Sequence, residues 1–216
     1  MTFSDSFWLW LECFGVASGL LYLWLEMKQR RAMWVVGGLC SLLYIFVFAA
    51  ARIYADMAFN VYNVAMSVYG FLAWRKAGSS AVAESLKRDA GSAGSGDASA
   101  DVVYRRLSLV MFLRILSVGV LIYGVIFTTL RQLTDSPVPG WDALTTTLSI
   151  VATWMLARRY IEQWIGWLLV NLISLYLYYL RGLYPTMGLY LFYTAASAVG
   201  YWIWLRRGKL QKDNSL

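Results

Sequence analysis

The sequence contains no histidine and is poor in charged residues, cysteine and proline. Of its 216 residues only 14% are charged, whereas 60% are hydrophobic and 17% are aromatic. So few charges cannot cover the surface of a water-soluble globular protein, so lipid must solvate most of the outside. The two cysteines, Cys13 and Cys40, lie in separate apolar stretches without other metal ligands nearby. We therefore expect neither a disulfide framework nor a zinc site, and no other metal or cofactor.

Lysine and carboxylate side chains are absent from the middle of the apolar stretches. The carboxylates closest to these stretches lie near their ends: Glu12, Glu26, Asp56, Asp142 and Glu162. A carrier driven by a proton or sodium gradient normally holds a buried carboxylate or histidine, so this absence favours facilitated diffusion. A retinal protein needs a lysine within a span, and a membrane-embedded enzyme needs a nucleophile beside a base. The sequence supplies neither, so we do not expect an enzyme.

Seven apolar runs have about the 20-residue length that a helix needs to cross a bilayer. They cover residues 7–27, 33–51, 54–74, 107–130, 141–157, 161–180 and 184–205. Basic residues gather at alternate ends of these runs, which places the N-terminus outside and the C-terminus in the cytoplasm. Because these charges alternate with the spans and form no single patch, we expect no nucleic-acid partner. The residues before the first run carry no positive charge, so we expect no cleaved signal peptide.

An internal repeat largely decides the predicted fold. Residues 11–76 match residues 141–206 at a constant offset of 130, without a gap. Identical pairs include Trp24/Trp154, Trp34/Trp164, Tyr54/Tyr184, Met57/Met187, Ser67/Ser197, Gly70/Gly200 and Trp74/Trp204. Each copy is long enough for three spans, and one further span between them lets both copies enter the membrane from the same face. We therefore predict an all-α membrane protein of seven transmembrane helices, in which a linker helix joins two parallel three-helix repeats (3+1+3).

This organisation divides the chain into four parts. Residues 1–76 form the first three-helix repeat, and residues 104–131 form the linker transmembrane helix. Between them, residues 77–103 are rich in glycine, serine and alanine, so we expect a flexible cytoplasmic linker without a fold of its own. Residues 132–216 form the second three-helix repeat and a cytoplasmic tail.

Polar and aromatic residues within the predicted spans fall on single helical faces. Trp164, Trp167 and Asn171 are spaced by three and four residues, and Asn60 and Asn63 begin a similar stripe in the third span. Polar groups are costly in lipid, so these stripes face the protein interior. A buried amide such as that of Asn171 either ties helices together or contacts a substrate, and composition leaves both open. For Asn60 and Asn63, helix tethering or water contact is favoured.

Several of these residues also have an interpretation that involves no substrate. Tryptophans near span ends are usually exposed at the membrane interface, as we expect for Trp8, Trp10, Trp74, Trp141, Trp202 and Trp204. Small residues favour helix packing, as we expect for Gly70, Gly200, Ser67 and Ser197. Tryptophan faces beside neutral amides suit a flat cationic ring with a hydroxyl-bearing arm, because the indole attracts cations. Hexoses also stack on tryptophan, so a sugar is not excluded.

Seven motifs along the chain match those of a known family: Trp10-x-Glu12-x-x-Gly15-x-x-x-Gly19, Tyr54-Ala55, Tyr69-Gly70, Trp141-Asp142, Leu148-Ser149-Ile150, Arg158-Arg159 and Glu162-x-Trp164-x-x-Trp167-x-x-x-Asn171. Through these residues the chain resembles the PnuC family of vitamin transporters over nearly its whole length outside residues 77–103. The tryptophan pair followed four residues later by asparagine is the most specific of these signals. The resemblance implies a SWEET-like fold, a homotrimer and a position in the cell inner membrane.

The resemblance also implies a function and a site. The expected function is uptake of nicotinamide riboside by facilitated diffusion, with a cytoplasmic kinase trapping the vitamin by phosphorylation. Substrate contacts are implied at Trp167 and Asn171, with Trp164 and Glu162 in the same motif; Asn60 and Asn63 complete the predicted set. Nicotinamide riboside carriers tend to have glutamine in place of Asn60 and asparagine in place of Cys40, so thiamin is the alternative cargo. A sugar facilitator and a seven-span scaffold without transport are weaker alternatives.

Overall fold

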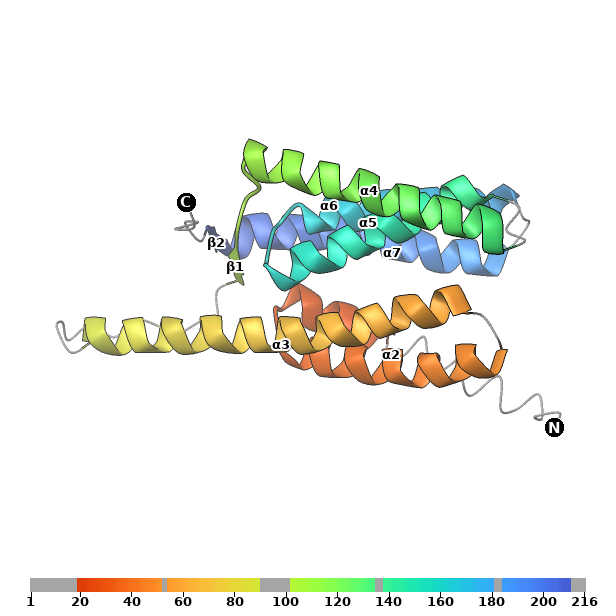
Figure 1. The fold of residues 1–216 in the computed structure, drawn as a ribbon. Helices are drawn as coiled ribbons and strands as arrows, with labels where there is room; N and C mark the ends of the chain where they lie inside the picture. The colour runs from red at the N-terminus through yellow and green to blue at the C-terminus, as the bar shows by residue number, and fades with distance from the viewer. Residues whose placement is uncertain (1–18, 52–53, 90–101, 135–137, 181–183, 211–216) are drawn as a thin grey trace. The chain divides into compact units, whose positions relative to one another are not determined.

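The computed structural model describes residues 19–51, 54–89, 102–134, 138–180 and 184–210 (Figure 1). The chain divides into two compact units, Met1–Ala100 and Asp101–Leu216. The first contains a helix over residues 19–27, α2 (Ala32–Ala51) and α3 (Tyr54–Asp89). The second contains β1 (Val102–Tyr104), α4 (Leu109–Leu133), α5 (Pro139–Ala157), α6 (Gln163–Leu180), α7 (Tyr184–Arg207) and β2 (Gly208–Leu210). Among the described residues, a helix thus lies in each of the seven predicted apolar runs.

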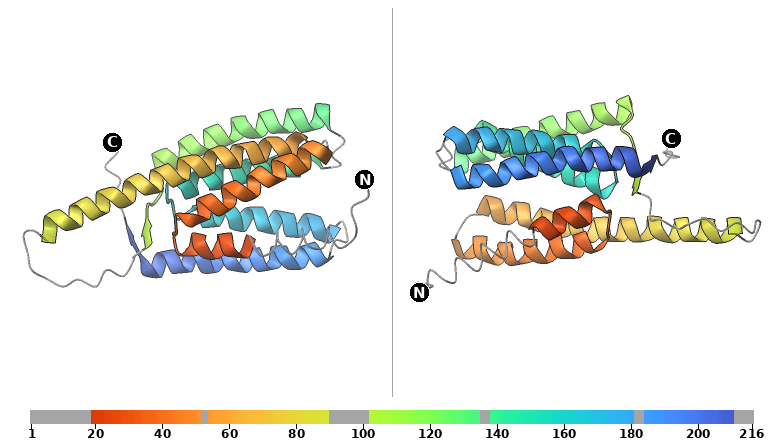
Figure 2. Two further views of the ribbon diagram at one scale, coloured as in Figure 1. Left: turned by 90° about the horizontal axis from the view of Figure 1, so that it is seen from below. Right: turned by 180° about the vertical axis from the view of Figure 1, so that it is seen from behind.

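In the first unit, α2 and α3 run side by side, as Figures 1 and 2 show. Small residues let the two helices approach closely. A Cβ added at Gly38 would lie 3.1 Å from the Cβ of Ser67, and one added at Gly70 would overlap the ring of Trp34. The predicted packing role of Gly70 and Ser67 is therefore confirmed.

The helix α3 continues well beyond the predicted span end, through Asp89. Residues 77–89, which were expected to belong to a linker without a fold, are therefore helical. Of the eleven residues 79–89, six are good helix formers (alanine, glutamate, leucine, lysine and arginine), and none is glycine or proline. They extend a helix that is already nucleated. At the other end of the expected linker, Val102 and Val103 belong to β1. Residues 90–101 lie outside the described residues.

In the second unit, residues 102–107 form a strap that connects two parts of the chain. β1 pairs with β2 in parallel, with Val102 opposite Gly208 and Tyr104 opposite Leu210. A Cβ at Gly208 would lie 2.5 Å from a ring carbon of Tyr104, so glycine fits the close approach. Farther along the strap, Arg105 N donates to Arg159 O at 2.9 Å. The strap therefore ties the end of α7 to the α5–α6 turn.

Because of the strap, α4 begins later than the predicted linker helix. Ser108 has extended backbone angles, and its Oγ accepts a hydrogen bond from Met111 N at 3.2 Å, which caps the helix. The predicted start at residue 104 is therefore wrong, because the β-favouring Val-Val-Tyr sequence pairs with β2 instead. None of the residues of α4 is buried. Its length and apolar composition suit a membrane span.

The two units repeat each other at the turn that precedes the second helix of each copy. Gln29 and Arg159, which are 130 residues apart, are non-glycine residues with positive φ angles of 48° and 61°. The backbone hydrogen bonds around them match in pairs: Lys28 N to Trp24 O (3.2 Å) with Arg158 N to Trp154 O (3.2 Å), and Arg30 N to Leu25 O (2.8 Å) with Tyr160 N to Met155 O (2.9 Å). The duplication read from the sequence therefore extends to local geometry.

Candidate substrate-binding site

Trp164 lies at the start of α6 and is buried against α7. Its ring meets that of Trp204 edge to face, with centroids 5.7 Å apart, and a Cβ at Gly200 would lie 2.5 Å from its Cη2. Trp34 and Trp74 repeat this arrangement in the first unit, with centroids 5.6 Å apart. Such pairs add stability beyond their buried area. Trp164 therefore joins two helices at this position in the unit.

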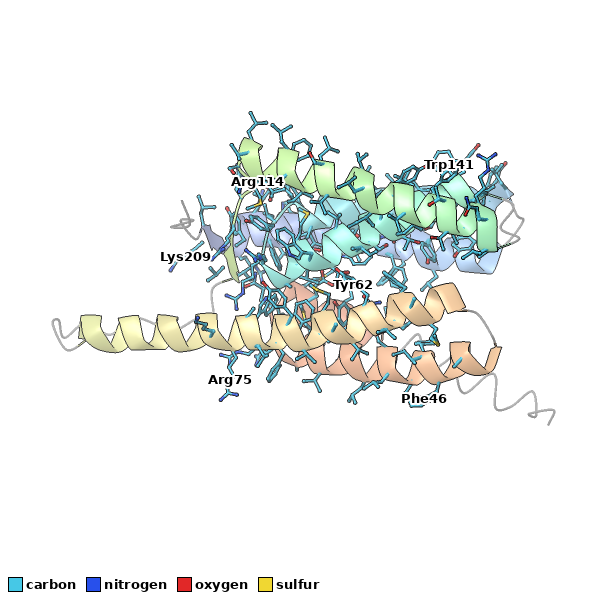
Figure 3. All side chains as sticks on the ribbon, in the orientation of Figure 1. Phe46, Tyr62, Arg75, Arg114, Trp141 and Lys209 are labelled. Carbon is cyan, nitrogen blue, oxygen red and sulfur yellow. The ribbon has the colours of Figure 1, made fainter. Side chains whose placement is uncertain are left out.

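The two third-helix tryptophans of these pairs were expected to be exposed at the membrane interface. Trp74 is only 1% exposed and Trp204 is fully buried, so that prediction is wrong for both. The reason is that each ring is covered by the tryptophan of the neighbouring helix. Trp141 and Trp202 are exposed, as expected (Figure 3 shows Trp141 near the start of α5). Trp8 and Trp10 lie outside the described residues.

Trp167 follows Trp164 by three residues on α6, and its side chain is half-buried. Its indole Nε1 is buried and has no hydrogen-bond partner among the described residues. In contrast to Trp164, which is 1% exposed, Trp167 is partly exposed. An accessible indole face is the feature that a flat aromatic or cationic solute can contact.

Asn171 lies one helical turn beyond Trp167 and is 7% exposed. Its Nδ2 donates to Ser197 Oγ on α7 at 3.2 Å, and Ser197 Oγ donates in turn to Tyr193 O at 2.8 Å. Asn171 therefore ties α6 to α7, which is one of the two roles that the sequence left open. Its Oδ1 accepts no hydrogen bond from the described residues, so the amide retains an acceptor for a second partner.

Three tyrosines continue the polar surface of α6 and α7 beyond Asn171. The ring centroids of Tyr178 and Tyr190 lie 4.9 Å apart, and those of Tyr190 and Tyr193 lie 5.9 Å apart. These tyrosines were not among the predicted site residues. At the offset of 130 residues, Tyr190 corresponds to Asn60 and Tyr193 corresponds to Asn63 in the first unit. The two copies therefore present different chemistry at matched places, phenol rings in one and amides in the other.

Asn60 and Asn63 are both half-buried on α3. Asn60 has an interaction partner, whereas Asn63 makes no hydrogen bond with the described residues. Between them on the helix, Tyr62 stacks on Phe59 with centroids 6.2 Å apart. These amides belong to a different unit from Trp167 and Asn171.

Glu162 lies in the turn just before α6 and contacts the strap. Its Oε1 accepts a hydrogen bond from Leu107 N at 3.2 Å, while its Oε2 is buried without a partner among the described residues. Nine residues separate Glu162 from Asn171, which is about 13 Å along a helix. Glu162 therefore lies next to the strap, at the start of α6, and not beside the side-chain amide of Asn171. Trp167 and Asn171 lie four residues apart on one face of α6.

The two helices that meet at Asn171 carry no formal charge beside it. α6 contains no acidic or basic residue, and α7 has none before Arg206. No cluster of three potential metal ligands occurs among the described residues. The pair therefore offers an aromatic face and a neutral amide acceptor, which are suited to binding and contain no nucleophile or base for catalysis.

The chain is similar to known transporters over most of its length. The sequence model of the family described as "Nicotinamide mononucleotide transporter" matches residues 9–206. The nicotinamide riboside transporter PnuC of Escherichia coli (strain K12) is 24% identical over 96% of this chain and 90% of that protein. The protein of the same name from Neisseria mucosa is 26% identical over 91% of this chain and 72% of that protein.

The fold also has a counterpart among solved structures. The crystal structure of the vitamin B3 transporter PnuC matches with a TM-score of 0.67 and 24% identity, covering 91% of this chain and 81% of that chain. At this identity the match shows the fold alone. Together with the exposed apolar surface of α4, it identifies an all-α membrane protein, as the sequence predicted.

Proposed function

The chain belongs to the nicotinamide mononucleotide transporter family, and from this premise we propose that it takes up nicotinamide riboside across the cell inner membrane. It is therefore a transporter and not an enzyme. The relatives from Escherichia coli and Neisseria mucosa carry the name of that cargo. The observation in this chain that carries the proposal is the neutral pair formed by Trp167 and Asn171, which suits an uncharged arm attached to a cationic ring.

Trp167 stacks on the pyridinium ring of the vitamin. The cation–π attraction contributes about 0.5–2 kcal/mol, depending on how far the ring is desolvated. Asn171 accepts a hydrogen bond from a ribose hydroxyl or the carboxamide through Oδ1, because its Nδ2 is engaged by Ser197. Trp164 and Glu162 position α6 for this contact, and Asn60 and Asn63 provide further polar contacts from the first unit.

The transport mode is facilitated diffusion. Without a fixed negative charge near Asn171, binding of the cation stays weak enough for release on the other side. Net uptake then depends on a lower concentration inside, which a cytoplasmic kinase maintains by phosphorylating the vitamin. The phosphate group adds negative charge and prevents return through an apolar path.

The architecture that accompanies this function has seven membrane spans, with parallel repeats at residues 1–76 and 132–216 and the linker helix between them. The matched positive-φ residues Gln29 and Arg159 support the duplication. The N-terminus lies outside and the C-terminus in the cytoplasm, because basic residues alternate along the chain. We further propose a homotrimer, from the family resemblance alone.

Thiamin is the second candidate cargo, favoured by Asn60 and Cys40 where the nicotinamide riboside carriers tend to have other residues. Counterflow in proteoliposomes separates the candidates. Nicotinamide riboside, thiamin and glucose are each preloaded on the inside, and uptake of the labelled solute is measured without any ion gradient. We expect exchange of nicotinamide riboside alone. Exchange of thiamin alone, or of glucose alone, would identify that solute as the cargo in place of nicotinamide riboside. A requirement for a proton or sodium gradient would overturn facilitated diffusion.

A further inference from the structure

The apolar helix α4 carries one charge that its own unit does not neutralise. Arg114 is the only charged residue of α4 before Arg131. Its side chain is exposed, and it has no hydrogen-bond or ion-pair partner among the described residues. Figure 3 shows Arg114 near the N-terminal end of α4, toward the strap. In a helix that lipid surrounds, an anion near this guanidinium would lower the cost of its charge.

The side of α4 that carries Arg114 is turned away from its neighbouring helix. α4 packs on α5 through Gly119, whose added Cβ would lie 4.0 Å from Thr147 Cγ2, and through Tyr123, whose hydroxyl lies 3.6 Å from a Cβ added at Gly140. With about 100° per residue, Arg114 lies about 160° from the centre of the face that Gly119 and Tyr123 define. Apolar side chains that are at least half exposed surround it on the helix surface: Val110, Leu113, Val118 and Leu121.

The depth of Arg114 suits the lipid phosphates. It is five residues beyond the helix start at Leu109, which is about 7.5 Å along the axis. A long arginine side chain spans that distance and places its guanidinium at the headgroup level, while its methylenes stay among apolar groups. Arg106, which is also exposed, precedes the helix on the same end. The strap holds this end of α4 in place through the backbone of Arg105.

We propose that Arg114 and Arg106 bind the phosphate of an anionic phospholipid in the leaflet at the N-terminal end of α4. The lipid tails lie along the exposed apolar face, and the headgroup meets the two guanidinium groups. Arginine is suited to this contact because its planar donors bind phosphate in a bidentate manner. The phosphate and the apolar face together require a lipid, since free phosphate would use only the charged end.

The test uses the full-length protein in detergent, titrated with phosphatidylglycerol or phosphatidylcholine and followed by native mass spectrometry. We expect Arg114→Gln to lower the affinity for phosphatidylglycerol about fivefold, the equivalent of about 1 kcal/mol per basic residue at an anionic surface. Arg114→Lys, which keeps the charge, should lose less. Arg131→Gln is the matched control, because it removes the same charge from the other end of α4.

Three outcomes would overturn the proposal. An equal loss in Arg131→Gln would show that net charge decides, and not this site. Competition by inorganic phosphate at the same concentration as the lipid would show a site for free phosphate. A change of oligomeric mass in Arg114→Gln, with lipid affinity unchanged, would show that Arg114 contacts a second copy of the chain.

Discussion

The double role assigned to Asn171 predicts that two substitutions around one hydrogen bond have different effects. Ser197→Ala removes the partner of Asn171 Nδ2 but leaves the amide in place. Asn171→Leu removes both the link to α7 and the Oδ1 acceptor. If Oδ1 contacts the vitamin, only the second change weakens transport affinity directly.

The magnitudes follow from the burial of both groups. Ser197 is 3% exposed and Asn171 is 7% exposed, so Ser197→Ala leaves a buried amide N–H unpaired. That costs about 1–3 kcal/mol of stability. Asn171→Leu replaces the amide by an apolar group of similar size, so part of that cost is avoided. Loss of one hydrogen bond to the substrate is worth about 0.5–1.5 kcal/mol, which raises the half-saturation concentration by roughly two- to twelvefold.

The assay is counterflow of nicotinamide riboside over a range of concentrations, with thermal unfolding in detergent measured on the same preparations. We expect Ser197→Ala to lower the unfolding temperature while half-saturation stays near the wild-type value. Asn171→Leu should raise half-saturation. Leu172→Ala, at the exposed neighbouring position, is the control and should leave half-saturation unchanged. If the Asn171→Leu and Ser197→Ala variants had the same half-saturation concentration, the substrate contact of Asn171 Oδ1 would be refuted. Asn171 would then only connect α6 to α7.

Three further predictions concern the packing and turns of the two units. Gly200→Ala forces a Cβ to within 2.5 Å of the Trp164 ring and should lower the free energy of unfolding by about 1–3 kcal/mol, whereas Gly188→Ala, with no atom within 4 Å, should leave thermal unfolding unchanged. Gln29→Gly should raise the unfolding temperature, because glycine relieves about 1 kcal/mol of positive-φ strain that Gln29→Ala would retain. Glu162→Gln should keep transport affinity, since an amide oxygen still accepts from the strap; a large loss would instead identify the carboxylate as a substrate ligand.

Helix positions could be predicted because each element is a long apolar run bounded by charge or turn residues. For example, α2 extends from Ala32 to Ala51, and the predicted run covers residues 33–51. The strap could not be predicted in this way. Its strands are three residues long, which is too short to show the alternation of apolar and polar residues that identifies a strand. Their pairing also joins residues more than one hundred positions apart. The extension of α3 to Asp89 differs from the prediction because the glycine, serine and alanine content of residues 77–103 favours a linker without a fold, whereas residues 77–89 continue an existing helix.

The candidate site was predictable in part for a similar reason. Helical spacing placed Trp164, Trp167 and Asn171 on one face of α6, but spacing does not say which ring is covered by a neighbour. Gly200, four residues before Trp204, was the signal in the sequence that a ring packs against that surface of α7. The contact between Glu162 and Leu107 needed the strap and so could not be foreseen.

The strap has a consequence for how the protein is made. Tyr104 pairs with Leu210, so its partner leaves the ribosome 106 residues later, after all of α4 to α7. At about 5–20 residues per second, this imposes a delay of roughly 5–20 s between synthesis of the two strands. During that interval α4 to α7 are synthesised one after another while β1 has no partner strand. Pairing of the two strands is the event that completes the second unit, and a nascent chain stopped before Gly208 never reaches it.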